Sequence, residues 1–122
     1  MSLTHTTAIR NGLADYVVDA IDVGGAGTFE FQTSGDVEVA TLTFSATAFG
    51  DAASGVATAN AITSDTSATG GAVAKFRIYS GGATEIVAGS VAVSGEDVDI
   101  SSVVIASGET VAITSLTYTA SP

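Results

Sequence analysis

The segment Thr28–Phe44, with the sequence TFEFQTSGDVEVATLTF, decides the fold class because its apolar residues recur at every second position. Phe29 and Phe31 fall on one side of the first half, and polar residues fall on the other. The second half alternates in the same way, with a phase slip at Ala40 and Thr41 that predicts a β-bulge. The linking residues TSGD contain Ser-Gly and are typical of a tight turn. The segment therefore predicts a β-hairpin.

Similar alternation recurs along the rest of the chain, most clearly in VAKFRIYSG, where Phe76 and Ile78 alternate with Lys75 and Arg77. Val, Ile and Thr dominate these segments, and Ser-Gly turns separate several of them. About seven to eight short strands at this spacing predict a mainly β protein, an antiparallel β-sandwich without a long helix after residue 27. The predicted core comprises Phe29, Phe31, Leu42, Phe44, Phe76, Ile78, Val87, Val91, Ile100, Val104, Ile113, Leu116 and Tyr118.

The first segment of the chain has a different period. The apolar residues of TTAIRNGLADYVVDAID, which begins at Thr6, recur at helical spacing and predict one N-terminal α-helix over residues 6–21. Thr6 or Thr7 can cap the start of this helix by accepting a backbone N–H, and Gly24 and Gly25 end it. An isolated helix of this length is marginal in water, so the helix must pack on another surface.

These patterns divide the chain into a helical arm at residues 1–27 and a β-sandwich domain at residues 28–122. The β-region has enough alternating residues for its own two-layer core, so we expect the helix to pack across the sheet edge or on a neighbouring subunit. The expected interface residues are apolar residues of the helix and one aromatic residue of the Ala/Thr/Ser/Gly-rich stretch at 42–64: Ile9, Leu13, Tyr16, Val17 and Phe49. The residues expected to face outwards are Asp15, Asp19 and Asp22, with Arg10 near the start of the exposed face.

The charge balance limits the possible partners. Thirteen acidic residues oppose only Arg10, Lys75 and Arg77, which gives a formal net charge of −10. Nucleic acids and anionic membrane surfaces attract basic residues, so neither is expected as a partner. Neighbouring copies should repel each other at low salt, and we expect the affinity between copies or for a particle to rise or stay level as salt increases. No secretory signal and no apolar run of transmembrane length is expected.

The sequence contains no arrangement that predicts catalysis. His5 is the only histidine and lies near the N-terminus, and no serine has the context of a nucleophile elbow. The acids Glu96, Asp97 and Asp99 could bind a hard cation, but they lack the spacing of a calcium loop and are interpreted as solvated turn residues. Spacing cannot locate a carboxylate pair for glycoside hydrolysis among thirteen acids. We therefore expect no enzyme activity, no cofactor and no metal ion.

Several motifs together resemble a known family. The helix contains R-N-x-L-x-D, and residues 42–62 contain L-T-F-S-x-x-A-F-G-x-A-x-x-G-V-x-T-A-N-x-I. A strand with x-F-R-I follows, and the chain closes with G-x-T-V-x-I-x-S-L-T-Y-T at residues 108–119. This pattern covers nearly the whole chain and resembles small virion-associated structural proteins of tailed bacteriophages. The central block carries the specific part of the resemblance.

The resemblance implies a structural role without catalytic residues. The expected function is that of a head-decoration, or cement, protein that binds the outer surface of the capsid. The alternative is a tail- or fibre-associated β-sandwich that acts as an adhesion or connector protein. The implied partners are the major capsid protein or another virion protein, and the expected assembly is a homotrimer because cement proteins commonly occupy threefold positions. The implied location is the virion surface, after assembly in the host cytoplasm.

Overall fold

The chain is mainly β with one helix, as the sequence predicts. The computed structural model describes residues 3–92, 98–99, 103–113 and 115–120. Its elements, in chain order, are α1 (Thr7–Ile21), β1 (Thr28–Gln32), β2 (Glu38–Phe44), β3 (Val56–Thr58), β4 (Ile62–Thr63), β5 (Gly71–Ala72), β6 (Lys75–Tyr79), β7 (Glu85–Ala92), β8 (Val98–Asp99), β9 (Val104–Ile105) and β10 (Thr117–Thr119).

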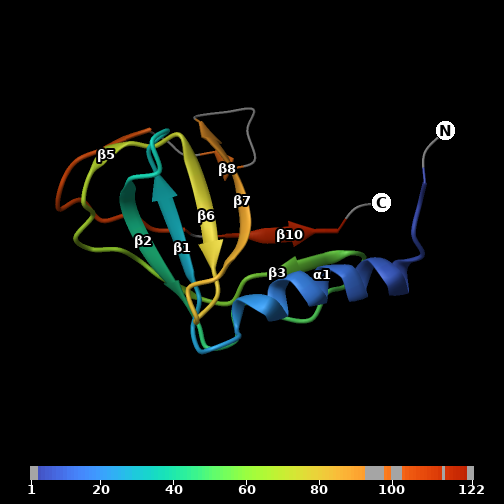
Figure 1. Cartoon of the computed structure of the whole chain (residues 1–122). Coiled ribbons are helices and arrows are strands. Elements are labelled where there is room, and N and C mark those ends of the chain that lie inside the picture. Colours follow the sequence, from blue (N-terminus) through green and yellow to red (C-terminus); the bar gives the residue numbers. More distant parts are fainter. Residues whose placement is uncertain (1–2, 93–97, 100–102, 114, 121–122) are drawn as a thin grey trace.

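One sheet dominates the structure (Figure 1). Its antiparallel part has the strand order β4-β2-β1-β6-β7, and β8 extends it in parallel beside β7. The predicted hairpin is confirmed: β1 and β2 are antiparallel neighbours, and the N–H of Thr33 donates to the carbonyl of Val37 at 2.8 Å across the turn. The predicted bulge is displaced slightly, because the register shifts opposite Phe31 and Gln32 and leaves Val39 as the extra residue.

The alternation of β1, β2 and β6 separates the two faces of the sheet. Phe29 is paired with Leu42 on β2 and with Ile78 on β6, so these apolar side chains lie on the same face. Phe31 is paired with Phe76 in the next row. Side chains on this face are buried, whereas most residues between them face the polar side of the sheet.

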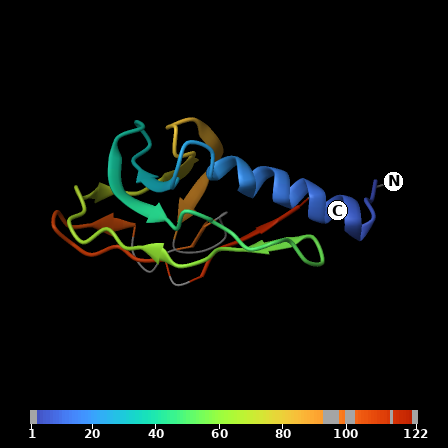
Figure 2. The ribbon, with the colours of Figure 1, turned by 90° about the horizontal axis from the view of Figure 1, so that it is seen from below.

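The layer that covers the apolar face is made of short segments (Figure 2). Outside the main sheet, the described strands form the pair β5–β9 and the pair β10–β3, which continues beyond the sheet along α1 (Figure 2). The buried residues of these segments and the loops beside them are mostly small: Ala48, Phe49, Ala57, Ala68, Val73 and Ile105. A closed sandwich of seven to eight strands is not confirmed, because the described segments of this layer form two separate two-stranded pairs. Because the side chain of Ala is small, the backbone of an Ala-rich segment can lie close to the sheet.

The predicted core is largely present. Phe29, Phe31, Leu42, Phe44, Phe76, Ile78 and Val91 are buried. Four further predicted residues are partly buried and pack against this core: Val87, Ile113, Leu116 and Tyr118. The prediction for Val104 is wrong, because Ile105 occupies the inward position of β9 and its neighbour Val104 is exposed. Ile100 lies outside the described residues.

The predicted helix is confirmed within one residue. Thr6 caps α1, and its hydroxyl oxygen accepts the N–H of Ile9 at 3.4 Å. The helix ends at Ile21, and Gly24 follows with a φ of 86° where the chain turns against Gly82. After residue 27 the described chain contains no further helix, as predicted.

Burial of the ring of Phe76 yields a stability prediction. We expect Phe76→Ala to lower the free energy of unfolding by about 3–5 kcal/mol, because the ring is buried and stacks on Phe29 with centroids 4.9 Å apart. Thr43→Ala is the matched control, since Thr43 is an exposed strand residue of β2. Chemical denaturation of both variants measures the difference, and a loss below about 1 kcal/mol for Phe76→Ala would contradict the assigned packing.

Candidate interaction surface on the N-terminal helix

The helix α1 packs along the ribbon formed by β3 and β10, on an extension that leaves the main sheet (Figures 1 and 2). Its buried residues are Ala14, Val18 and Ile21, which recur at helical spacing and form one face. Val18 and Ile21 belong to the same hydrophobic cluster as Phe29. The helix therefore shares the core of the strands.

Polar side chains on the same side of α1 attach the loop that precedes β3. The side-chain carbonyl of Asn11 accepts the N–H of Gly55 at 2.8 Å. The carboxylate of Asp15 accepts the N–H of Ala52 at 2.8 Å, and that of Asp22 accepts the N–H of Ala48 at 2.8 Å. These three bonds satisfy N–H groups of the loop that do not donate to a neighbouring strand.

Arg10 completes the attachment at the start of the helix. Its Nη2 donates to the carbonyl of Ala120, just after β10, at 3.3 Å. The guanidinium lies directly against Gly55, where an added Cβ would be 2.6 Å from the Cζ of Arg10. Gly55 also has a φ of 77°, a conformation that disfavours residues with a side chain.

Gly55→Ala tests this contact. We expect it to lower the free energy of unfolding by at least about 1–2 kcal/mol, because the new methyl group is strained by the positive φ and collides with Arg10. In an Arg10→Ala background the collision disappears and only the backbone strain remains, so the same substitution should cost less. Thermal or chemical denaturation of the four variants measures this coupling, and an equal cost in both backgrounds would show that the two residues are not in contact.

The opposite face of α1 carries a second set of apolar side chains. The exposed fractions are 54% for Ile9, 42% for Leu13 and 80% for Tyr16. These residues are spaced by four and three positions, so they form one row along the helix surface. We call this row the exposed stripe.

The structure places the predicted interface residues in different environments. Ile9, Leu13 and Tyr16 form the exposed stripe, and Val17 is half-buried beside it. Phe49 is only 4% exposed, and its ring packs against Phe44 with centroids 5.8 Å apart. Phe49 therefore lies in the core of the chain rather than on its surface.

The expected orientation of the helix is wrong. Asp15 and Asp22 were expected to face outwards, but both bind loop N–H groups within the chain, and Arg10 lies against Gly55. Only Asp19 faces outwards as expected. The correct docking face has its own signal in the sequence, because Ala14, Val18 and Ile21 recur with helical spacing. Because Ala14 is small, this face is less hydrophobic in the sequence than the exposed stripe.

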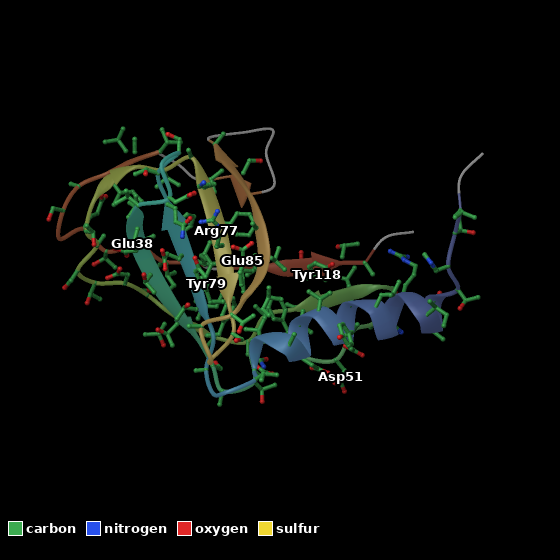
Figure 3. The ribbon with its side chains drawn as sticks, in the orientation of Figure 1. Glu38, Asp51, Arg77, Tyr79, Glu85 and Tyr118 are labelled. Atoms are coloured by element: carbon green, nitrogen blue, oxygen red, sulfur yellow. The ribbon has the colours of Figure 1, made fainter. Side chains whose placement is uncertain are left out.

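Negative charge borders the exposed stripe. Asp19 follows Tyr16 by three positions and is therefore its neighbour on the helix surface. Asp51, in the loop before β3, lies beside α1 (Figure 3). Desolvation by the surrounding protein, and then the charges of Asp15, Asp22 and Asp51, raise the pKa of the Asp19 carboxyl above its usual value. The border of the stripe therefore has a negative potential that the chain does not compensate.

Asp19→Asn tests this potential. Because the pKa of Asp19 is higher in the folded chain than in the unfolded chain, ionisation of this carboxyl destabilises the fold as the pH rises through the folded value. At pH 7 we expect Asp19→Asn to raise the free energy of unfolding by roughly 0.2–0.5 kcal/mol, as for other like-charge pairs on a helix. The gain should vanish at about pH 3, where Asp is protonated in both states.

Thermal unfolding of the wild type and the variant at both pH values measures this gain. Asp19→Glu is the matched control, because it keeps the charge and should leave the stability at pH 7 nearly unchanged. An equal gain at low and neutral pH would contradict an electrostatic origin.

The other two basic residues lie on the polar face of the main sheet. Lys75 forms an ion pair with Asp36. Arg77 lies 3.0 Å from Glu85 through Nε and Oε1, and its Nη1 donates to the side-chain carbonyl of Gln32 at 2.9 Å (Figure 3). Together with the contacts of Arg10, these pairs engage every Lys and Arg side chain of the sequence within the chain itself.

Two pockets lie elsewhere on the described surface. One, of about 280 Å³, is lined by residues near the start of β1 and the end of β6 that include Glu30 and Tyr79. The other, of about 150 Å³, lies between the β3–β4 region and the segment before β10. The first lies near the lower end of the range of typical ligand sites, about 300–1,000 Å³, and the second lies below it.

The remaining candidate from the sequence is the acidic cluster that could bind a hard cation. The acids Glu96 and Asp97 lie outside the described residues, as does the side chain of Asp99. Among the residues that are described, no group of three or more His, Cys, Asp or Glu side chains could hold a metal ion. In the same part of the chain, α1 is too short and too polar to cross a membrane.

Comparison with known proteins adds no relative. No family model matches the chain, and neither a curated protein nor a solved structure is significantly similar to it. The geometry of α1 and the sequence motifs are therefore the basis for a functional proposal.

Proposed function

We propose that this chain is a structural subunit of a tailed-bacteriophage particle, a decoration protein that binds the outer surface of the head. The sequence motifs support this class of protein, since the resemblance covers nearly the whole chain. The observation that carries the proposal is the exposed stripe: α1 is already docked through one face, yet Ile9, Leu13 and Tyr16 remain accessible on the other.

The exposed stripe supports attachment to another protein for a physical reason. Contiguous apolar side chains in water are unfavourable, and such patches commonly mark protein–protein contacts. A tyrosine at the centre of a contact contributes a large apolar ring with little loss of side-chain entropy, and Tyr is enriched among residues that dominate binding. A helix held rigidly by its other face presents these side chains in a fixed arrangement.

The construction of the body also suits a particle component. The covering layer consists largely of small residues and short segments. A decoration protein requires a stable scaffold and an attachment surface, whereas it requires no cleft for chemistry. The proposed partner is the major capsid protein or another virion protein, and the proposed assembly on the head is a homotrimer in the virion.

Location and copy number in the particle test this function. In particles purified from the virus that encodes this chain, we expect hundreds of copies, measured by quantitative mass spectrometry against the major capsid protein. Antibody labelling in electron microscopy should place them on the head surface. A handful of copies at one end would favour the tail- or fibre-associated alternative, and a particle without this chain would overturn both.

The oligomeric state is measured separately on the isolated chain. Sedimentation equilibrium should give three times the protomer mass of 11.9 kDa if the trimer forms in solution. A protomer mass at all concentrations, together with threefold positions on the head, would mean that the trimer forms only on the particle.

A further inference from the structure

The exposed stripe is apolar and has acidic residues at its border. These two features together define the kind of partner surface that would fit it. The row runs from Ile9 to Tyr16, which is about 10 Å along the helix axis. Asp19 continues the same surface beyond Tyr16, and Asp51 approaches it from the neighbouring loop. A matching surface therefore needs an apolar centre with positive charge beside it.

The Lys and Arg side chains of a second copy do not provide that positive charge. Arg10 lies on the docked side of α1 and contacts Gly55 and Ala120. Lys75 and Arg77 are paired with acids on the polar face of the main sheet. Two stripes packed against each other would place the acidic borders of both copies at one interface without a compensating Lys or Arg side chain, which is unfavourable.

The dimensions of the stripe also disfavour a symmetric pair. A stable interface buries about 800 Å² on each partner, and three side chains over two helical turns supply only part of that area. A concave partner buries more, because a groove encloses the sides of the helix as well as the row itself. Val17, half-buried beside the row, would then become fully buried.

We propose that the exposed stripe of α1 inserts into an apolar groove of the head shell, a different protein, whose rim presents Lys or Arg side chains to Asp19 and Asp51. This inference rests on the proposed function and names the chemistry of its partner surface. The net charge alone led to the expectation that affinity rises or stays level with salt. The geometry reverses that expectation for this contact, because salt screens attraction between Asp19 and a basic rim.

Rebinding of the purified chain to head shells assembled without it tests the inference. Leu13→Ser and Tyr16→Ser should each weaken binding at least about tenfold, as truncation of a central apolar anchor does. Val37→Ser and Val104→Ser are matched controls, since both side chains are exposed aliphatic residues outside α1. These controls should change the affinity less than about twofold. Melting temperatures establish that all four variants are folded.

The charge of the border is tested in the same assay. Wild-type affinity should fall as salt rises from about 50 to 300 mM, over which the range of charge interactions shortens markedly. Asp19→Asn combined with Asp51→Asn should weaken binding at low salt and flatten the salt dependence, even though Asp19→Asn stabilises the isolated chain. Glu109→Gln, which removes an exposed acid far from α1 in sequence, should leave both unchanged.

Each result separates the two proposals. Failure of the wild type to bind any head shell overturns the proposed function, and the inference with it. Wild-type binding that is unaffected by Leu13→Ser and Tyr16→Ser, or that strengthens with salt, overturns the inference and leaves the proposed function standing. A loss of self-association in Leu13→Ser, seen by sedimentation of the isolated chain, would assign the stripe to a second copy and would also overturn it.

Discussion

Packing of aromatic rings on the central strands forms the apolar face on which the covering segments rest. Phe29 of β1 stacks on Phe76 of β6 with an angle of 9° between the rings, and its centroid lies 5.0 Å from that of Phe31. The covering layer contributes mainly Ala and Val, each of which buries little apolar area. These three rings therefore supply a large share of the apolar area that the core buries.

The same shortage of large side chains is accompanied by polar contacts that help to attach α1. The loop before β3 offers α1 few apolar groups but several unpaired backbone N–H groups, and Asn11, Asp15 and Asp22 accept them. Acids in the last turns of a helix oppose the helix dipole, and α1 has no basic residue there to offset them. Hydrogen bonds to the loop, rather than the electrostatics of the helix itself, therefore account for Asp15 and Asp22.

Attachment through polar side chains has a consequence for function. The docking face buries only Ala14, Val18 and Ile21, and the row of Ile9, Leu13 and Tyr16 remains on the other side. The cations of the chain are engaged internally at the same time, so the solvent-facing border of α1 is acidic. One arrangement thus produces both an apolar row and an uncompensated negative charge, which are the two properties on which the proposed partner surface is based.

Local pattern was sufficient for much of this description. Alternation in Thr28–Phe44 determined the hairpin and its buried face, because side chains on a strand alternate with a period that the sequence displays directly. Helical spacing, with a capping Thr6 and Gly24 beyond the end, determined α1 within one residue. The row of Ile9, Leu13 and Tyr16 was also visible as a candidate interface, although its exposure was not.

Only the tertiary structure decided what each face contacts. The helix has two apolar faces, and the sequence favoured the larger one, whereas the loop from Ala48 to Gly55 binds the face that carries matching acceptors. The sequence predicted that Phe49 lies at an interface, because it stands among small residues. In the structure its ring packs against Phe44 in the core. The covering layer likewise depends on which short segments meet across the sheet. These outcomes depend on contacts between residues far apart in the chain, and a period in the sequence carries no information about the partner on the other side.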